Sequence, residues 1–186
     1  MQFNLTTTQQ TVVDQIFEKY KDRKNLNEGN QKKAYTNGLD IKDILTLERV
    51  FADHLVGEKI YQAMVLVEFI PWAIHTDYLK GDSNPAKAIL IPYQTQNTHT
   101  LVFNEECLTK TADLPELAVN VTQEMQEQFL SHCSKEQILR VTHDYTYKWV
   151  RGTGITWDRK KLHASDNFLN NNIKEKIALV IFTEKQ

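Results

Sequence analysis

The chain has few of the residues that cross-link or interrupt a fold. Its 186 residues include six glycines, four prolines and two cysteines. Cys107 and Cys133 lie far apart and without CxxC spacing, so we expect reduced thiols rather than a disulfide framework or a zinc site. We find no low-complexity linker and no internal repeat, which predicts a single domain over residues 1–186 with room for a real hydrophobic core.

Long apolar runs and an excess of positive charge are also missing. No segment approaches the roughly 18 apolar residues of a membrane span. Residues 1–6 have neither the basic start nor the apolar stretch of a secretory signal. The formal net charge is −2 at pH 7, which argues against a large basic face for nucleic acid or anionic membranes and leaves room for a small local patch. We therefore expect a cytoplasmic protein that uses neither as a partner.

Several common catalytic motifs are absent. The sequence contains no GxSxG, HExxH, P-loop or GxGxxG pattern. These patterns position a nucleophile, a metal ion or a phosphate group, so their absence argues against the commoner hydrolase, ATPase and dinucleotide-binding classes.

The first part of the chain has helical periodicity. Thr7 and Gln10 could form a capping box, followed by apolar residues at helical spacing up to Tyr20. The polar stretch 21–31 predicts a loop, and a second helix is expected to begin near Asp40. These elements form the helical start of the domain, about residues 1–57.

From Ile60 onward the pattern changes to short runs rich in aliphatic and β-branched residues. These runs predict strands at 60–70, 88–91, 98–103, 145–150, 155–157 and 176–183. Two short helices are expected among them, at 122–133 and 134–139. Helices followed by many short strands favour an α+β protein, with N-terminal helices packed outside a β-sandwich or jelly-roll core of about residues 58–186.

His75 and Asp77 place an imidazole and a carboxylate two residues apart. In an extended segment these side chains point to the same side, so one metal ion could contact both. His163 offers a third ligand from elsewhere in the chain. Two histidines and one carboxylate leave three coordination positions open, which is typical of non-haem Fe(II) oxygenases. An HxD triplet by itself is also compatible with a solvated pair beside a strand end.

The order of these residues resembles the 2-oxoglutarate- and Fe(II)-dependent dioxygenase superfamily. An HxD pair, a distal histidine and a basic residue that opens the next strand, Lys176, occur in the order that the family shows. Segments 88–92 and 98–103 resemble its paired core strands, and segment 149–165 resembles its approach to the distal histidine. The resemblance covers roughly residues 60–183.

The resemblance implies a double-stranded β-helix core with Fe(II) bound by His75, Asp77 and His163. It also implies 2-oxoglutarate and dioxygen as cosubstrates, with the far carboxylate of 2-oxoglutarate bound by Lys176. Most members of the family use arginine there, and a lysine lacks the planar fork that grips a carboxylate with two hydrogen bonds. Lys174 is a second candidate. Lys87 is a third, because some branches place a lysine on a strand soon after the HxD pair.

The activity implied is hydroxylation or a related oxidation, with release of succinate and carbon dioxide. Asp77 occupies the position where a halogenase needs a small residue. We expect a small-molecule or protein side-chain substrate, selected by segments 80–85 and 107–130, and the sequence carries no signal for oligomeric state. Two alternatives stay open: a cupin-type metalloenzyme that does not use 2-oxoglutarate, and a non-catalytic jelly-roll module that binds a ligand.

Overall fold

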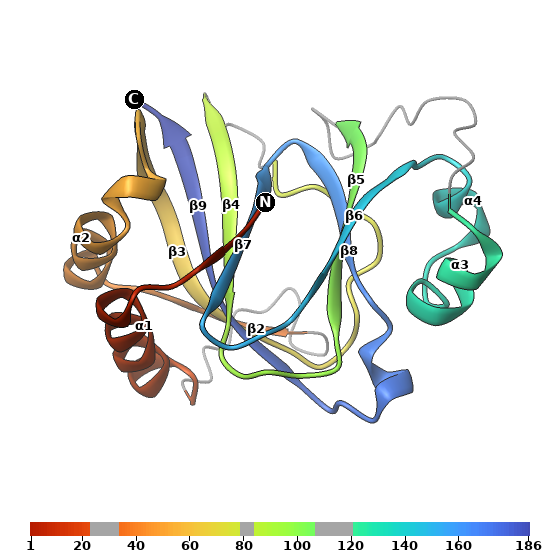
Figure 1. The fold of residues 1–186 in the computed structure, drawn as a ribbon, viewed down its shortest axis with the longest axis horizontal. Helices are drawn as coiled ribbons and strands as arrows, with labels where there is room; N and C mark the ends of the chain where they lie inside the picture. Colours follow the sequence, from red (N-terminus) through yellow and green to blue (C-terminus); the bar gives the residue numbers. More distant parts are fainter. Residues whose placement is uncertain (23–33, 79–83, 107–120) are drawn as a thin grey trace.

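Two antiparallel sheets form the centre of the molecule (Figure 1). The structure, a computed structural model, describes residues 1–22, 34–78, 84–106 and 121–186. Within these ranges the larger sheet has the strand order β1-β7-β4-β9-β3-β2 and the smaller has β6-β5-β8. The strands are β1 (Gln2–Asn4), β2 (Ala34–Gly38), β3 (Glu58–Glu68), β4 (Pro85–Pro92), β5 (His99–Glu106), β6 (His143–Lys148), β7 (Thr153–Asp158), β8 (Lys161–Ser165) and β9 (Lys176–Lys185).

Two helices, α1 (Thr7–Tyr20) and α2 (Ile41–Val50), cover the outer face of the larger sheet (Figure 1). The capping box of α1 starts one residue earlier than predicted: the Gln9 amide donates to Thr6 Oγ1 at 3.2 Å, and the Thr6 amide donates to Gln9 Oε1 at 2.9 Å. Asp40 caps α2, as the sequence predicts, and a short 3-10 turn, η1 (Ala52–His54), follows it.

Strand β9 is buried on both faces, which explains its continuous apolar run. Leu179 and Ile181 pack outward in the cluster under the helices, whereas Val180 and Phe182 pack inward between the sheets. Because successive side chains of a strand point to opposite faces, a strand covered on both sides must be apolar at every position. The inward set of side chains forms the floor of the space between the sheets.

The smaller sheet has its own cover of two short helices, α3 (Gln123–Phe129) and α4 (Lys135–Ile138) (Figure 1). Leu101 and Leu162 point outward into the cluster beneath these helices. The alternate residues of β8, His163 and Ser165, therefore face the larger sheet. A 3-10 turn, η2 (Phe168–Asn171), leads from β8 towards β9.

The sequence predicted most of these elements to within a few residues. It missed β1 and β2, which lie in the segment expected to be helical, and β8, which was not identified as a strand. The loop predicted at 21–31 falls mostly outside the described residues, as do Cys107 and much of the two segments expected to select the substrate. Cys133 is a free, buried thiol, as predicted.

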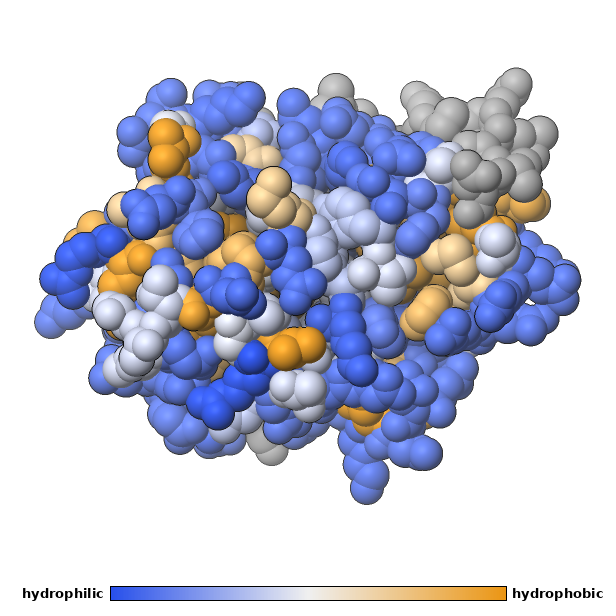
Figure 2. All heavy atoms as spheres, viewed as in Figure 1, coloured by the Kyte–Doolittle hydropathy of each residue, from blue (hydrophilic) through white to orange (hydrophobic). Residues whose placement is uncertain are grey.

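The face seen in Figure 2 is hydrophilic over most of its area. Hydrophobic residues form small separate groups, chiefly over the end that carries α1 and α2 and near the end that carries α3 and α4. No helix in the described ranges is long and apolar enough to cross a membrane.

Gly154→Ala is expected to destabilise the fold. Phe3 of β1 pairs with Gly154 of β7, and a Cβ at this glycine would overlap the Phe3 ring. Such overpacking should lower the free energy of unfolding by about 1–3 kcal/mol, measured by urea denaturation. Gly38→Ala is the matched control because a Cβ there meets nothing within 4 Å. Equal stability of the two variants would contradict the prediction.

Candidate metal centre

A pair of backbone hydrogen bonds brings the predicted ligands together. The His75 amide donates to the His163 carbonyl at 2.9 Å, and the His163 amide donates to the His75 carbonyl at 2.8 Å. The Ser165 amide donates to the Trp72 carbonyl at 3.2 Å, which extends the pairing by one step. The HxD segment therefore lies antiparallel beside β8, with both histidines at one level.

His75, Asp77 and His163 each offer one ligand atom, and these atoms all lie within 4.8 Å of one another. Nε2 of His163 is 3.4 Å from Oδ2 of Asp77, and the two imidazole centroids are 4.2 Å apart. The predicted residues thus form one cluster. Two imidazole nitrogens and one carboxylate oxygen are a donor set that suits Fe(II), so the residues present fit a non-haem iron ion.

The other nitrogen of each imidazole faces a carbonyl. Nδ1 of His75 is 2.7 Å from the Ala73 carbonyl, and Nδ1 of His163 is 3.3 Å from the Lys161 carbonyl. A carbonyl oxygen only accepts hydrogen bonds, so in both histidines Nδ1 carries the proton and donates it. These hydrogen bonds hold both rings in orientation and select the neutral tautomer in which Nε2 carries the lone pair that binds a metal ion.

His163 is suited to ligation because it stays neutral. Burial lowers its pKa from 6.5 to about 4, although the nearby Asp77 carboxylate raises it in opposition. Desolvation disfavours the charged imidazolium more than this single carboxylate favours it. The imidazole therefore needs to lose no proton before it binds a metal at neutral pH.

Arg159 holds the HxD segment in place through hydrogen bonds to its backbone and to Thr76. Its Nη2 donates to the Asp77 carbonyl at 3.0 Å, while Thr76 Oγ1 donates to the Arg159 carbonyl at 2.8 Å. A further bond from Nη1 to the Thr183 carbonyl, at 3.3 Å, ties this arrangement to β9. Arg159 is fully buried, so these bonds act without competition from water.

The three ligands lie on the wall of a cavity of about 430 Å³ between the two sheets. Most of the wall is apolar, with inward side chains of β3, β4 and β9 and all three tryptophans of the chain. The polar lining residues besides the ligands are Thr36, Glu68, Thr76, Thr100, Ser165 and Lys176.

Lys176 is the one of the three predicted lysines that reaches this cavity. It is 1% exposed, and its Nζ lies 3.3 Å from Glu68 Oε2. Lys87 lines another region, where its Nζ contacts Glu58 at 3.0 Å and donates to the His54 carbonyl. Lys174 is exposed. The geometry therefore favours Lys176 as the cation that a ligand in the cavity would meet.

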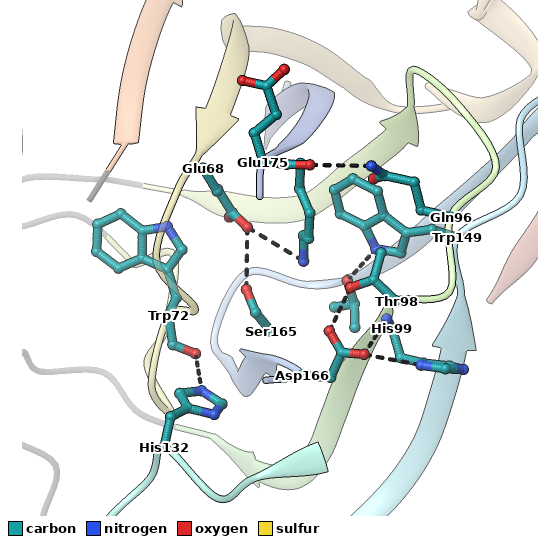
Figure 3. Close-up of polar contacts among 12 residues, drawn as sticks. Glu68, Trp72, Gln96, Thr98, His99, His132, Trp149, Ser165, Asp166 and Glu175 are labelled. Atoms are coloured by element: carbon teal, nitrogen blue, oxygen red, sulfur yellow. Dashed lines mark hydrogen bonds and ion pairs between the residues drawn. The ribbon is translucent and has the colours of Figure 1, made fainter. Parts of the chain in front are cut away.

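Other histidines have structural partners. His99 Nδ1 lies 3.0 Å from Asp166, which also accepts hydrogen bonds from the His99 amide and Thr98 Oγ1 (Figure 3). His132 Nε2 lies 3.1 Å from the Trp72 carbonyl. His99 and His132 are therefore held in place by hydrogen bonds outside the metal-binding cluster.

Three residues of the site were not singled out from the sequence. Arg159 and Ser165 sit in loops and strands whose partners are distant, so the sequence gives no signal for them. Glu68 does leave a signal, since it is an acid directly after the apolar run 63–67. Among the aromatic residues, Trp72 and Trp157 line the cavity, whereas Tyr93 packs on Phe17.

Metal-free protein should lose stability as the pH falls from about 6.5 to about 4, because unfolded His163 binds a proton there that the folded state rejects. The loss attributable to His163 should reach about 3 kcal/mol. Urea denaturation of chelator-treated protein at several pH values measures it. The half-buried His54, His132 and His143 also have lowered pKa values and act in the same direction. The comparison is therefore with His163→Gln, whose stability should fall less over the same pH range. Parallel curves for the two proteins would refute the assignment.

Thr76→Val should weaken metal binding while leaving the fold intact. It removes the hydroxyl that joins the HxD segment to Arg159, so Asp77 loses part of its support. Loss of such an outer partner should lower metal affinity roughly tenfold. Anaerobic Fe(II) titration monitored by calorimetry gives the affinity. Thr46→Val in α2 is the control, because its hydroxyl bonds only within an exposed helical turn. An unchanged Fe(II) affinity in Thr76→Val would show that the hydrogen bond between Thr76 and Arg159 is not needed for metal binding.

Comparison with known proteins gives a fold relationship without a sequence relationship. No family model and no curated protein matches the sequence. Among solved structures, the non-haem α-ketoglutarate-dependent carbocyclase SnoK from nogalamycin biosynthesis superposes with a TM-score of 0.61 at 10% identity, over 100% of this chain and 79% of that one. A Pseudomonas putida prolyl-4-hydroxylase gives 0.55 at 9% identity, over 100% and 92%. The chain therefore shares the double-stranded β-helix (jelly-roll) fold of these two enzymes, with N-terminal helices packed outside it.

Proposed function

We propose that this protein is an Fe(II)- and 2-oxoglutarate-dependent dioxygenase that hydroxylates or otherwise oxidises its substrate. One observation carries the proposal. The His75, Asp77 and His163 cluster lies on the wall of a cavity that also contains the buried cation of Lys176. A metal-binding triad and a carboxylate-binding cation in one cavity are the two features that a chelating dicarboxylate cosubstrate requires.

His75, Asp77 and His163 would hold the iron. With 2-oxoglutarate and dioxygen, the bound metal supplies an oxidation in which one oxygen atom enters the substrate and the other enters succinate, with loss of carbon dioxide. The chain contributes by orienting both imidazole rings through their Nδ1–carbonyl hydrogen bonds and by fixing the HxD segment through Arg159.

Lys176 would orient the cosubstrate through its far carboxylate. Its Nζ lies 4.2 Å from the ring centroid of Trp149 and 5.1 Å from that of Phe168. These rings stabilise the cation by their faces and keep water away, so a charge-assisted hydrogen bond from Lys176 would be stronger than one on the surface. Ser165, which ends β8 and faces the same side as His163, is placed to offer a second hydrogen bond.

The cavity is suited to a small-molecule or protein side-chain substrate. Its volume of about 430 Å³ falls within the usual range for a site that encloses a small ligand. The two structural neighbours above are a carbocyclase and a prolyl hydroxylase, so both kinds of substrate occur on this fold. The net charge of −2 argues against nucleic acid, and we place the protein in the cytoplasm.

One observation favours the cupin-type alternative, a metalloenzyme that does not use 2-oxoglutarate. Lys176 already contacts a carboxylate, that of Glu68, at 3.3 Å. If this pair were permanent, the metal site would remain but the cation would not recognise a cosubstrate.

Anaerobic titration of the Fe(II)-loaded protein with 2-oxoglutarate tests the proposal. The wild type should develop the weak visible charge-transfer band of chelated cosubstrate. His163→Ala should abolish it, because a ligand is lost. Lys176→Met should need at least about tenfold more 2-oxoglutarate, because it removes the cation that binds the far carboxylate. A tenfold change corresponds to about 1.4 kcal/mol of binding free energy.

Lys87→Met is the matched control, because it removes a partly buried lysine outside the cavity and should titrate like the wild type. Iron binding without any band, in both the wild type and Glu68→Gln, would reject 2-oxoglutarate and support the cupin-type alternative.

A further inference from the structure

The cavity contains a buried carboxylate that competes for its only described lysine. Glu68 is 5% exposed and lies directly across the sheet from Lys176 in the register of β3 and β9. The same Glu68 oxygen, Oε2, lies 3.3 Å from Lys176 Nζ and accepts a hydrogen bond from Ser165 Oγ at 3.3 Å (Figure 3). Glu68 thus occupies both of the donors that a ligand carboxylate would use.

The charges at this end of the cavity are already balanced. Around Lys176 Nζ the structure places one carboxylate, from Glu68, and the two ring faces of Trp149 and Phe168. A second carboxylate arriving from a ligand would leave one uncompensated negative charge in a region shielded from water. Burying such a charge costs free energy, so the ligand carboxylate and the Glu68 carboxylate cannot both form a full ion pair with Lys176.

We propose that Glu68 is an internal competitor that occupies Lys176 until the cosubstrate displaces it, and so sets the affinity and selectivity for 2-oxoglutarate. This inference rests on the proposed function, because it assumes that Lys176 receives the far carboxylate. Glu68 lowers the gain from that carboxylate, since every molecule of cosubstrate must first break the Glu68–Lys176 contact. A 2-oxo acid without a far carboxylate has no such contact to break.

The chain supplies its own control for the alternative that Glu68 merely stabilises the sheet. Glu58, at the other end of β3, also forms an ion pair with a lysine, Lys87, at 3.0 Å. This pair lies outside the cavity lining. Both glutamates therefore sit on one strand and pair with a lysine, and they differ in whether that lysine lines the cavity.

The experiment compares wild type, Glu68→Gln and Glu58→Gln, each loaded with Fe(II) under anaerobic conditions. Each is titrated with 2-oxoglutarate and with 2-oxopentanoate, which has the same five-carbon chain without the far carboxylate. Glu68→Gln keeps the shape of the side chain and removes its charge. It should bind 2-oxoglutarate about tenfold more tightly than the wild type, which corresponds to about 1.4 kcal/mol, with little change for 2-oxopentanoate. Glu58→Gln should match the wild type for both ligands.

The decisive quantity is the ratio of the affinities for 2-oxoglutarate and 2-oxopentanoate, because a general loss of structure in a variant would change both affinities together. If Glu68→Gln binds 2-oxoglutarate with equal or lower affinity than the wild type, the inference is wrong; lower affinity would show that Glu68 holds Lys176 in position. If no protein responds to either 2-oxo acid although each binds Fe(II), the proposed function itself fails. Thermal melts verify folding, and Glu68→Met, also similar in size and uncharged, replaces the glutamine variant if that one does not fold; it too should bind 2-oxoglutarate more tightly.

Discussion

The site depends on the two reciprocal backbone hydrogen bonds between His75 and His163. They join a segment outside the regular strands to β8, and so bring ligands that are far apart in the sequence to one point. Backbone bonds fix positions more firmly than side-chain contacts, because the peptide groups have little freedom once the strand is paired. The side chains need only project inward, which the alternation of β8 dictates for His163 and Ser165 alike. The cavity, Lys176 and the hydrogen bonds of Arg159 to the HxD segment are all arranged around this backbone pair.

The interior contains several buried charged and polar side chains, and burying them costs free energy. Arg159, Lys176, Glu68 and His163 are all buried in or beside a largely apolar space. Buried charges contribute little to stability even when paired, and an apolar replacement of similar size often stabilises a fold. Each of these groups nevertheless has partners: carbonyls for Arg159, a carboxylate and two aromatic rings for Lys176, and a carbonyl for His163. A cluster of this kind is better explained by ligand binding than by folding.

The sequence revealed the local features of the site and missed those that depend on strand register. His75 and Asp77 were predictable because their spacing alone sets them on one side of an extended segment. Lys176 was predictable as the start of a strongly apolar strand. Its contact with Glu68 was not, since the alignment of β3 with β9 is a long-range property that neither strand encodes separately. Strand β8 escaped notice because its inward residues, His163 and Ser165, are polar, so its hydrophobic signal is confined to alternate positions. Strands β1 and β2 are short and pair at the edges of the sheet, where position rather than propensity decides.

The aromatic lining gives the protein a built-in optical probe. The chain has three tryptophans, and all of them, Trp72, Trp149 and Trp157, border the same cavity. The Trp157 ring centroid is 4.8 Å from that of His163, and Trp149 covers the Lys176 ammonium group at 4.2 Å. Emission excited at the indole absorption therefore originates entirely around this space, with no background from tryptophans elsewhere in the fold. Filling of the metal position and rearrangement at the lysine would each alter the surroundings of a different indole, so the intrinsic fluorescence of the unlabelled protein reports on both.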